Sequence, residues 1–304
     1  MPSPPVEPLA AVIALLRPQA VLSKIVSGAG RWSIRYERYE DPGFCVVLEG
    51  SCFLDAGEAG LFELREGDFV LLPEVPGFTL ASDLELEPAL VQPTAVETRH
   101  GEAEGEAAMR MLGGSFRFDR ANAQLLVRLL PAVIHIRRDD PEAERLRRIV
   151  EWIAEEAKSD RPGRDLILAR LAEVLLVEAL RFRAATADKQ QQGLLAGLAD
   201  PLLARSLRAI HEDAARCFTV EALARTAGMS RAVFAEKFKT KVGMPPMQYL
   251  LEWRMAIAKD LLRRERPPLA ELAERIGYES ASAFSTAFAR HAGCPPSKFA
   301  RLSS

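Results

Sequence analysis

Cysteine and histidine, the residues that build most metal and redox sites, are scarce in this chain. It has 304 residues, of which four are cysteine and four are histidine. Cys45, Cys52, Cys217 and Cys294 are scattered and form no C-x-x-C pair. This pattern is typical of reduced thiols, and it argues against a disulfide framework and against a zinc finger.

Long apolar runs are also missing. The longest run near the N-terminus, residues 9–16, has eight residues, whereas a membrane-spanning helix needs roughly 18. The same segment lacks the basic start and the small-residue cleavage pattern of a signal peptide. We therefore expect a cytoplasmic protein that does not associate with membranes.

The charge is unevenly distributed along the chain. The net formal charge is −2, but residues 201–304 carry 17 Lys and Arg against 10 Asp and Glu, which gives that segment +7. Residues 1–200 are correspondingly at −9. A chain of this length usually forms two domains, and a basic C-terminal domain is expected to meet a polyanion such as nucleic acid. Chance clustering on a solvated surface is the alternative.

The C-terminal third contains an internal repeat. Leu223, Ala224 and Gly228 recur 49 positions later as Leu272, Ala273 and Gly277. At an offset of 50, Ser230, Phe234, Phe238, Gly243, Pro245, Pro246 and Tyr249 recur as Ser280, Phe284, Phe288, Gly293, Pro295, Pro296 and Phe299. The repeat predicts two copies of one supersecondary unit, with a turn one residue longer in the second copy.

Each copy predicts a helix, a tight turn and a second helix. In the first copy, Thr219 is expected to N-cap the leading helix, and Gly228 suits the left-handed residue that ends it. Ser230 is expected to cap the second helix by accepting a bond from a backbone N–H, and Phe234 and Phe238 share one face of that helix. This is the helix-turn-helix pattern of DNA-binding proteins. A plain helical hairpin repeat is the alternative.

Residues 201–304 resemble the DNA-binding domain of the AraC/XylS family. The resemblance is carried by residues 223–243 and by the stretch 276–299. It implies transcription regulation at double-stranded promoter DNA, as an activator or a repressor, with RNA polymerase as a further partner. Between the two copies, residues 246–266 predict one long helix that would set the spacing of two recognition helices.

The resemblance and the side-chain chemistry also assign individual residues. The base-facing positions are Arg231, Ala232, Ala235, Glu236, Ala281, Ser282, Ser285 and Thr286. The phosphate-facing positions are Ser230, Lys239, Lys241, Ser280, Arg290 and Lys298. Only Arg231 among the base-facing residues can form a bidentate pair with guanine, so we expect modest direct readout.

Residues 30–120 have a different pattern. Short β-rich runs recur at 32–39, 44–48, 52–55, 61–64 and 69–72, separated by glycine and proline turns. They resemble a cupin barrel, and over residues 7–185 the chain is similar to the cupin-type sensor that precedes many AraC-like domains. The implied fold is multi-domain α+β: a cupin-like β-barrel with trailing helices, a linker at 186–200, and an all-α double helix-turn-helix domain at 201–304.

The barrel is expected to bind a small effector in its mouth. The expected lining residues are Trp32, Tyr36, Phe44 and Phe78. Catalytic cupins hold a metal through histidines and a carboxylate, and that pattern is missing here. Because Cys45 and His100 are the only candidate ligands, we expect no metal, no cofactor and no enzymatic activity. A metal-dependent enzyme fused to a DNA-binding domain is the less favoured alternative.

Two helices are predicted after the barrel, at 141–158 and 166–182, with a break at 160–163. The second is apolar over more than one face. This favours a homodimer interface, and a helix buried between its neighbours is the alternative. The resulting hypothesis is a ligand-responsive, dimeric transcription regulator. A constitutive regulator whose barrel is only structural is the competing hypothesis.

Overall fold

The structure, a computed structural model, describes residues 7–37, 41–73, 77–94, 96–118, 132–186 and 192–302. Within these ranges the chain forms two compact units. The first, which we call the barrel unit, holds residues 18–118 and 132–183. The second, the helical unit, holds residues 7–17 and 184–302. No helix in these ranges combines the length and the apolar character needed to cross a membrane.

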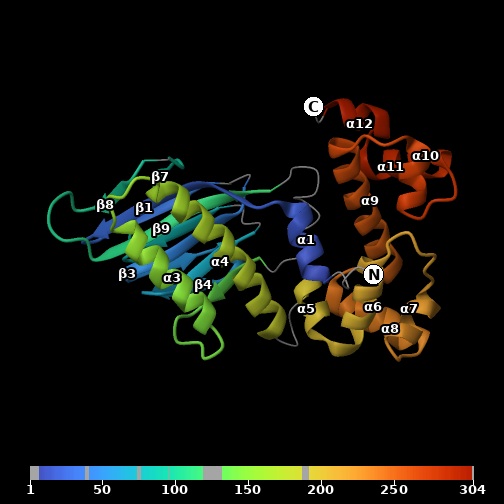
Figure 1. Ribbon diagram of the computed structural model, residues 1–304. Helices are drawn as coiled ribbons and strands as arrows, with labels where there is room; N and C mark the ends of the chain where they lie inside the picture. The colour runs from blue at the N-terminus through green and yellow to red at the C-terminus, as the bar shows by residue number, and fades with distance from the viewer. Residues whose placement is uncertain are drawn as a thin grey trace. The chain divides into compact units, whose positions relative to one another are not determined.

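The barrel unit is built on a curled ten-stranded sheet (Figure 1). Its strands are β1 (Gln19–Ala29), β2 (Ser33–Tyr36), β3 (Gly43–Asp55), β4 (Leu61–Arg65), β5 (Phe69–Leu72), β6 (Phe78–Ala81), β7 (Ala89–Val91), β8 (Thr98–Gly101), β9 (Met109–Arg117) and β10 (Ile134–Ile136). The long central strand β3 pairs with β4, β5, β6 and β9, and so joins the two halves of the sheet. β1 extends one half between β9 and β8, and β2 extends the other between β6 and β7.

Glycine at position 50 lets β3 pass from one half of the sheet to the other. The first part of β3 pairs with β5 and its last part pairs with β4. Gly50 has a φ of 72°, and a Cβ there would collide with the carbonyl oxygen of Ala108. The sequence predicts two strands here, at 44–48 and 52–55. That prediction is wrong, because Gly50 bends one continuous strand instead of closing a turn.

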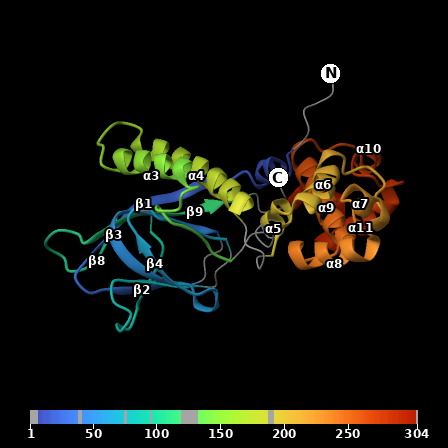
Figure 2. The same cartoon turned by 90° about the horizontal axis from the view of Figure 1, so that it is seen from below.

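Helices α3 (Glu144–Ala157) and α4 (Arg164–Thr186) lie across one face of the sheet (Figures 1 and 2). Both follow the sequence prediction with small shifts at their ends. Leu146, Val150 and Ile153 form the buried stripe of α3. The backbone turns between the helices at Gly163, whose φ of 87° suits a residue without a side chain.

The helical unit contains the two predicted helix-turn-helix copies. Its helices are α1 (Pro8–Leu16), α5 (Leu194–Ala199), α6 (Pro201–Glu212), α7 (Val220–Thr226), α8 (Arg231–Val242), α9 (Pro246–Arg264), α10 (Leu269–Arg275), α11 (Ala281–Ala292) and α12 (Pro296–Leu302). The copies are α7–α8 and α10–α11, and α9 is the long connecting helix. Gly228 and Gly277 stand in the turns with φ of 68° and 78°, as left-handed residues that end a helix.

The repeated phenylalanines form the core of each copy. Those of α8 and α11 are fully buried: Phe234, Phe238, Phe284 and Phe288. Phe238 packs against the ring of Tyr249 at 5.8 Å between centroids, and Phe288 packs against Phe299 at 5.4 Å. Because the same contact recurs at repeat-related positions, the sequence repeat is also a repeat of packing.

Helix α1 packs in the helical unit. The resemblance groups residues 7–185 as one domain, yet α1 belongs to the helical unit and contacts α6 and α9. Its apolar face, Leu9, Val12 and Leu16, is buried. The local sequence of α1 does not indicate which of the two units buries this face.

The expected linker is also partly ordered. Helix α5 lies within residues 186–200, and its Leu194 and Leu195 are buried. α5 contacts α6 and α8, and the Gly193 N–H donates to the Lys241 carbonyl at 2.8 Å. The two leucines make this segment part of the helical core.

Candidate DNA interface and effector cavity

Helix α8 presents the first set of expected base-facing residues. Its buried phenylalanines turn the opposite face outward: Arg231, Ala232 and Glu236 are exposed and Ala235 is half-buried. Ser230 precedes the helix in an extended conformation but makes no capping hydrogen bond, contrary to the prediction. The side chain of Ser230 is therefore not needed by the first turn of the helix.

Helix α11 presents the second set. Ser280 caps this helix by accepting a 3.1 Å bond from the Ala283 N–H. The expected base-facing residues divide by exposure: Ser282 and Thr286 are exposed, while Ala281 and Ser285 are half-buried. The Thr286 hydroxyl donates to the Ser282 carbonyl at 3.0 Å, so its methyl group and its oxygen lone pairs are available for contacts outside the helix.

The expected phosphate-facing cations differ in their surroundings. Lys239, Arg290 and Lys298 are exposed, and none of them forms an ion pair with any residue that the structure describes. Lys241 is half-buried. Three free cations on or next to the two recognition helices are suited to phosphate contacts.

Two other cations of α8 already have carboxylate partners. Arg231 Nε lies 2.8 Å from Glu221 Oε1 on α7, and both side chains are largely exposed. Lys237 Nζ lies 2.5 Å from Asp200 Oδ2, in a less exposed pair. To contact a base, the Arg231 side chain must first break its ion pair with Glu221.

Sequence reasoning missed one exposed residue of α8. Val233 is 56% exposed, next to the fully buried Phe234. An apolar side chain on the outer face of a recognition helix can contact a thymine methyl group. The signal was available, because Val233 directly precedes a predicted core residue and so lies about 100° away around the helix.

A buried histidine packs beneath the first helix-turn-helix copy. His211 of α6 forms a 2.7 Å hydrogen bond through Nε2 with the Tyr249 hydroxyl, and its ring lies 4.0 Å from that of Trp253 between centroids. Burial lowers the pKa of His211 from 6.5 to about 3. The imidazole is therefore neutral at physiological pH, and it joins α6 to α9 as a structural group.

The barrel unit encloses a cavity between its two half-sheets. The space that its lining residues surround, counted together with the open solvent at its mouth, is about 630 Å³, and most of the lining is apolar. Of the expected effector residues, Tyr36, Phe44 and Phe78 line it. Trp32 does not; its indole instead fills the space above Gly28, where a Cβ would collide with it.

The metal candidates of the barrel unit are Cys45 and His100. Within the described residues, no three His, Cys, Asp or Glu side chains are grouped so that they could hold a metal ion. Burial raises the pKa of the Cys45 thiol well above its usual range, and that of Cys52 to about 12. Burial likewise lowers the pKa of His100. Both thiols are therefore protonated, and the imidazole is neutral.

The other buried polar pair of the barrel unit is structural. His135 Nε2 lies 3.0 Å from Asp68 Oδ2, and Asp68 also accepts the backbone N–H groups of Arg65 and Arg138 at 3.1 and 3.0 Å. Burial raises the pKa of Asp68, but these hydrogen bonds outweigh it, and the net shift is downward. The carboxylate fastens the β4–β5 turn to the end of β10.

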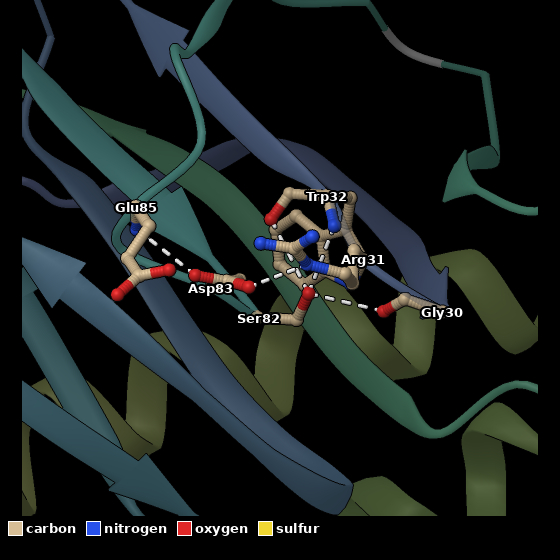
Figure 3. Close-up of polar contacts among 6 residues, drawn as sticks. All are labelled: Gly30, Arg31, Trp32, Ser82, Asp83 and Glu85. Atoms are coloured by element: carbon tan, nitrogen blue, oxygen red, sulfur yellow. Dashed lines mark hydrogen bonds and ion pairs between the residues drawn. The ribbon is translucent and has the colours of Figure 1, made fainter.

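A polar cluster links the segment before β2 to the segment after β6, next to the paired residues Ser33 and Ala81 (Figure 3). The Ser82 hydroxyl donates to the Gly30 carbonyl at 3.0 Å and accepts the Trp32 N–H at 2.8 Å. Arg31 Nε lies 2.6 Å from Asp83 Oδ2. These contacts fix the backbone of the turn that carries Trp32.

Comparison with known proteins agrees with both halves of this description. Residues 7–185 match the Cupin family, and residues 223–302 match the family described as Helix-turn-helix domain. A Streptomyces lividans protein that is named as an AraC-like transcription regulator is 36% identical over 297 residues, which cover 96% of this chain and 97% of the relative. The chain belongs to the AraC-like family of transcription regulators. It is a DNA-binding regulator with a cupin-type N-terminal domain.

Two further relatives of this AraC-like regulator are more distant or partial. The Escherichia coli activator RclR, named as specific for RCS, is 27% identical over 256 residues, or 84% of this chain and 82% of the relative. The solved DNA-binding domain of AdpA, in complex with a target DNA, is 33% identical and covers 34% of this chain and 92% of its own, with a TM-score of 0.32.

Proposed function

We propose that this AraC-like regulator reads promoter DNA with α8 and α11 and responds to a small molecule held in the barrel cavity. The observation that carries the second part is the cavity itself, which lies inside the curled sheet and is mostly apolar. Ligand sites are typically concave, apolar and furnished with a few polar groups. Activation through RNA polymerase is the proposed mode, supported by the name of the E. coli relative.

Binding of a neutral apolar fluorophore, N-phenyl-1-naphthylamine, tests whether the cavity accepts ligands. We expect the wild-type protein to bind it with enhanced fluorescence. Gly113→Leu should abolish binding, because Gly113 lines the cavity and a new side chain there would occupy it. Leu61→Phe is the matched control, because it adds volume at an exposed position of the same sheet. Equal binding by all three proteins would show that the fluorophore binds elsewhere, and would contradict the proposal.

We also propose that two copies of the chain associate through the outer face of α3 and α4. Trp152 of α3 is 57% exposed, and Leu166 and Val174 of α4 are 63% and 49% exposed. These helices cover one face of the sheet (Figure 2), and the three side chains are accessible to a partner. Large exposed apolar groups on one surface support a protein interface, and symmetric dimers are the commonest assembly.

Sedimentation velocity at micromolar concentration tests the dimer. Val174→Glu should shift the protein to a monomer, because a charge would be buried without a partner. Leu90→Glu is the control, because Leu90 is also an exposed apolar residue of the same unit, 66% exposed on β7, and should leave the dimer intact. A monomeric wild-type protein would contradict the proposal.

A further inference from the structure

One row of residues crosses the sheet on the face that lines the cavity. Lys24 of β1 is opposite Gly113 of β9, which is opposite Cys45 of β3, which in turn is opposite Val70 of β5. Directly opposed residues share a face of the sheet, and all four line the cavity. Because Gly113 has no side chain, the cavity reaches the backbone between Lys24 and Cys45.

Lys24 is the charged residue of this cavity. Every other described lining residue is neutral, and nine of them are aliphatic, aromatic or thioether side chains. Lys24 Nζ donates to Thr94 Oγ1 at 3.0 Å and to Thr98 Oγ1 at 3.1 Å. It forms no ion pair within the described part of the chain.

The two threonines accept two of the three N–H donors of the Lys24 ammonium group. The Thr98 hydroxyl donates to the Val96 carbonyl at 2.9 Å, so it can only accept from Lys24. An ammonium group has three N–H donors, and these contacts use two of them. The third has no acceptor among the described residues, although the side chain is partly desolvated, which lowers the pKa of Lys24.

A positive charge beside an apolar cavity, without a counter-ion, favours one kind of ligand. Partial burial of an unpaired charge is unfavourable, and a charged hydrogen-bond partner offsets that penalty. A ligand with an anionic end would place it on Lys24. Its apolar body would contact the side chains of Val26, Leu54 and Met111, which also line the cavity.

We propose that the ligand of the barrel cavity is a monocarboxylate with an aliphatic or aryl body, bound with its carboxylate on Lys24. This inference rests on the proposed effector function and specifies its chemistry. The carboxylate accepts the third N–H of Lys24. The Thr94 hydroxyl, which lies within reach of Thr98 and the Val96 carbonyl, can turn to donate a second bond to it.

Displacement of N-phenyl-1-naphthylamine by octanoate and by octan-1-ol tests this inference. Octanoate should displace the fluorophore from the wild type at a concentration about 10- to 100-fold lower than from Lys24→Met, as expected for loss of a charge-assisted hydrogen bond. Octan-1-ol should displace it equally from both proteins. Lys24→Arg should keep most of the preference for octanoate, and Arg137→Met, which removes an exposed cation of the same unit, should leave it unchanged.

The outcomes separate the two proposals. The fluorophore can bind in the cavity and yet be displaced by octanoate at the same concentration from Lys24→Met as from the wild type. In that case the carboxylate inference is wrong and the effector cavity stands. The same conclusion follows if the wild type shows no preference for octanoate over octan-1-ol. If the fluorophore does not bind, the effector function fails, and this inference fails with it.

Discussion

Arg17 and Asp260 are 243 positions apart in the sequence, yet Arg17 Nη2 lies 2.8 Å from Asp260 Oδ1. Arg17 ends α1 in a left-handed conformation, with a φ of 44°. Asp260 is nearly buried on α9, and Arg264 Nη1 lies 3.7 Å from its other oxygen. The ion pair fastens the first helix of the chain to the long helix between the two DNA-reading copies.

Replacing Arg17 should loosen the helical unit. We expect Arg17→Ala to reduce its stability by about 1 kcal/mol, because a partly exposed charged hydrogen bond is lost while Arg264 still faces Asp260. Hydrogen exchange measured by mass spectrometry should show faster exchange in α1. Arg205→Ala removes an exposed arginine of α6 and should change nothing. Equal exchange in both variants would show that the pair contributes no stability.

The apolar contact of α1 should matter more than its ion pair. Leu16 is 1% exposed, so Leu16→Ala should destabilise the helical unit by about 2–5 kcal/mol. Urea unfolding followed through Trp253, in a background with the other two tryptophans replaced by phenylalanine, reports on this unit alone. Leu251→Ala, at a more exposed position of α9, is the control. An unchanged urea midpoint for Leu16→Ala would mean that α1 does not dock in solution.

The stability of the helical unit should fall in mild acid. The pKa of His211 is about 3 when folded, against 6.5 when free, so between these values the unfolded chain binds a proton that the folded chain does not. Stability is therefore complete above about pH 6.5 and decreases as the pH falls, by about 2 kcal/mol at pH 5. Urea midpoints measured from pH 7.5 to 4.5 test this. His211→Gln should remove most of the slope, and an unchanged slope would assign it to other groups.

Two substitutions should separate the affinity for DNA from the preference for its sequence. Arg290→Ala should weaken binding to specific and non-specific DNA alike and reduce the salt slope by about one, because Arg290 is a free cation suited to a phosphate. Arg231→Ala should relax preference at about one base position. Both are measured on a library of single-base operator changes at fixed salt, with Arg137→Ala of the barrel unit as control. If only Arg290→Ala alters the preference, the two roles are reversed.

Elements with a strong local signal were predictable from the sequence. The run at residues 69–72 is bounded by turn residues, and it forms β5 with the same limits. The helix predicted at 246–266 is α9, which ends two residues earlier. In both cases an apolar pattern and its Gly, Asp or Pro boundaries lie in one short stretch.

Features that depend on distant partners were not predictable. The ammonium of Lys24 is held by Thr94 and Thr98, 70 and 74 positions away, so nothing near Lys24 marks it as part of a cavity. Trp32 was expected to line that cavity because it is a large aromatic on an alternating strand. The space above Gly28 takes its indole instead, and only the pairing of distant strands creates that space.

Because α1 packs in the helical unit, it is synthesised long before the helices that it contacts. The ribosome produces α1 before α9, and its partner on α9 is reached 243 residues after Arg17. At synthesis rates of about 5–20 residues per second, that interval is about 12–50 s. Until α6 and α9 are made, the apolar side chains of α1 lack their native partners, and the whole barrel sequence emerges before either helix. Translation that stops before α9 is complete would therefore leave the apolar face of α1 without part of its native cover.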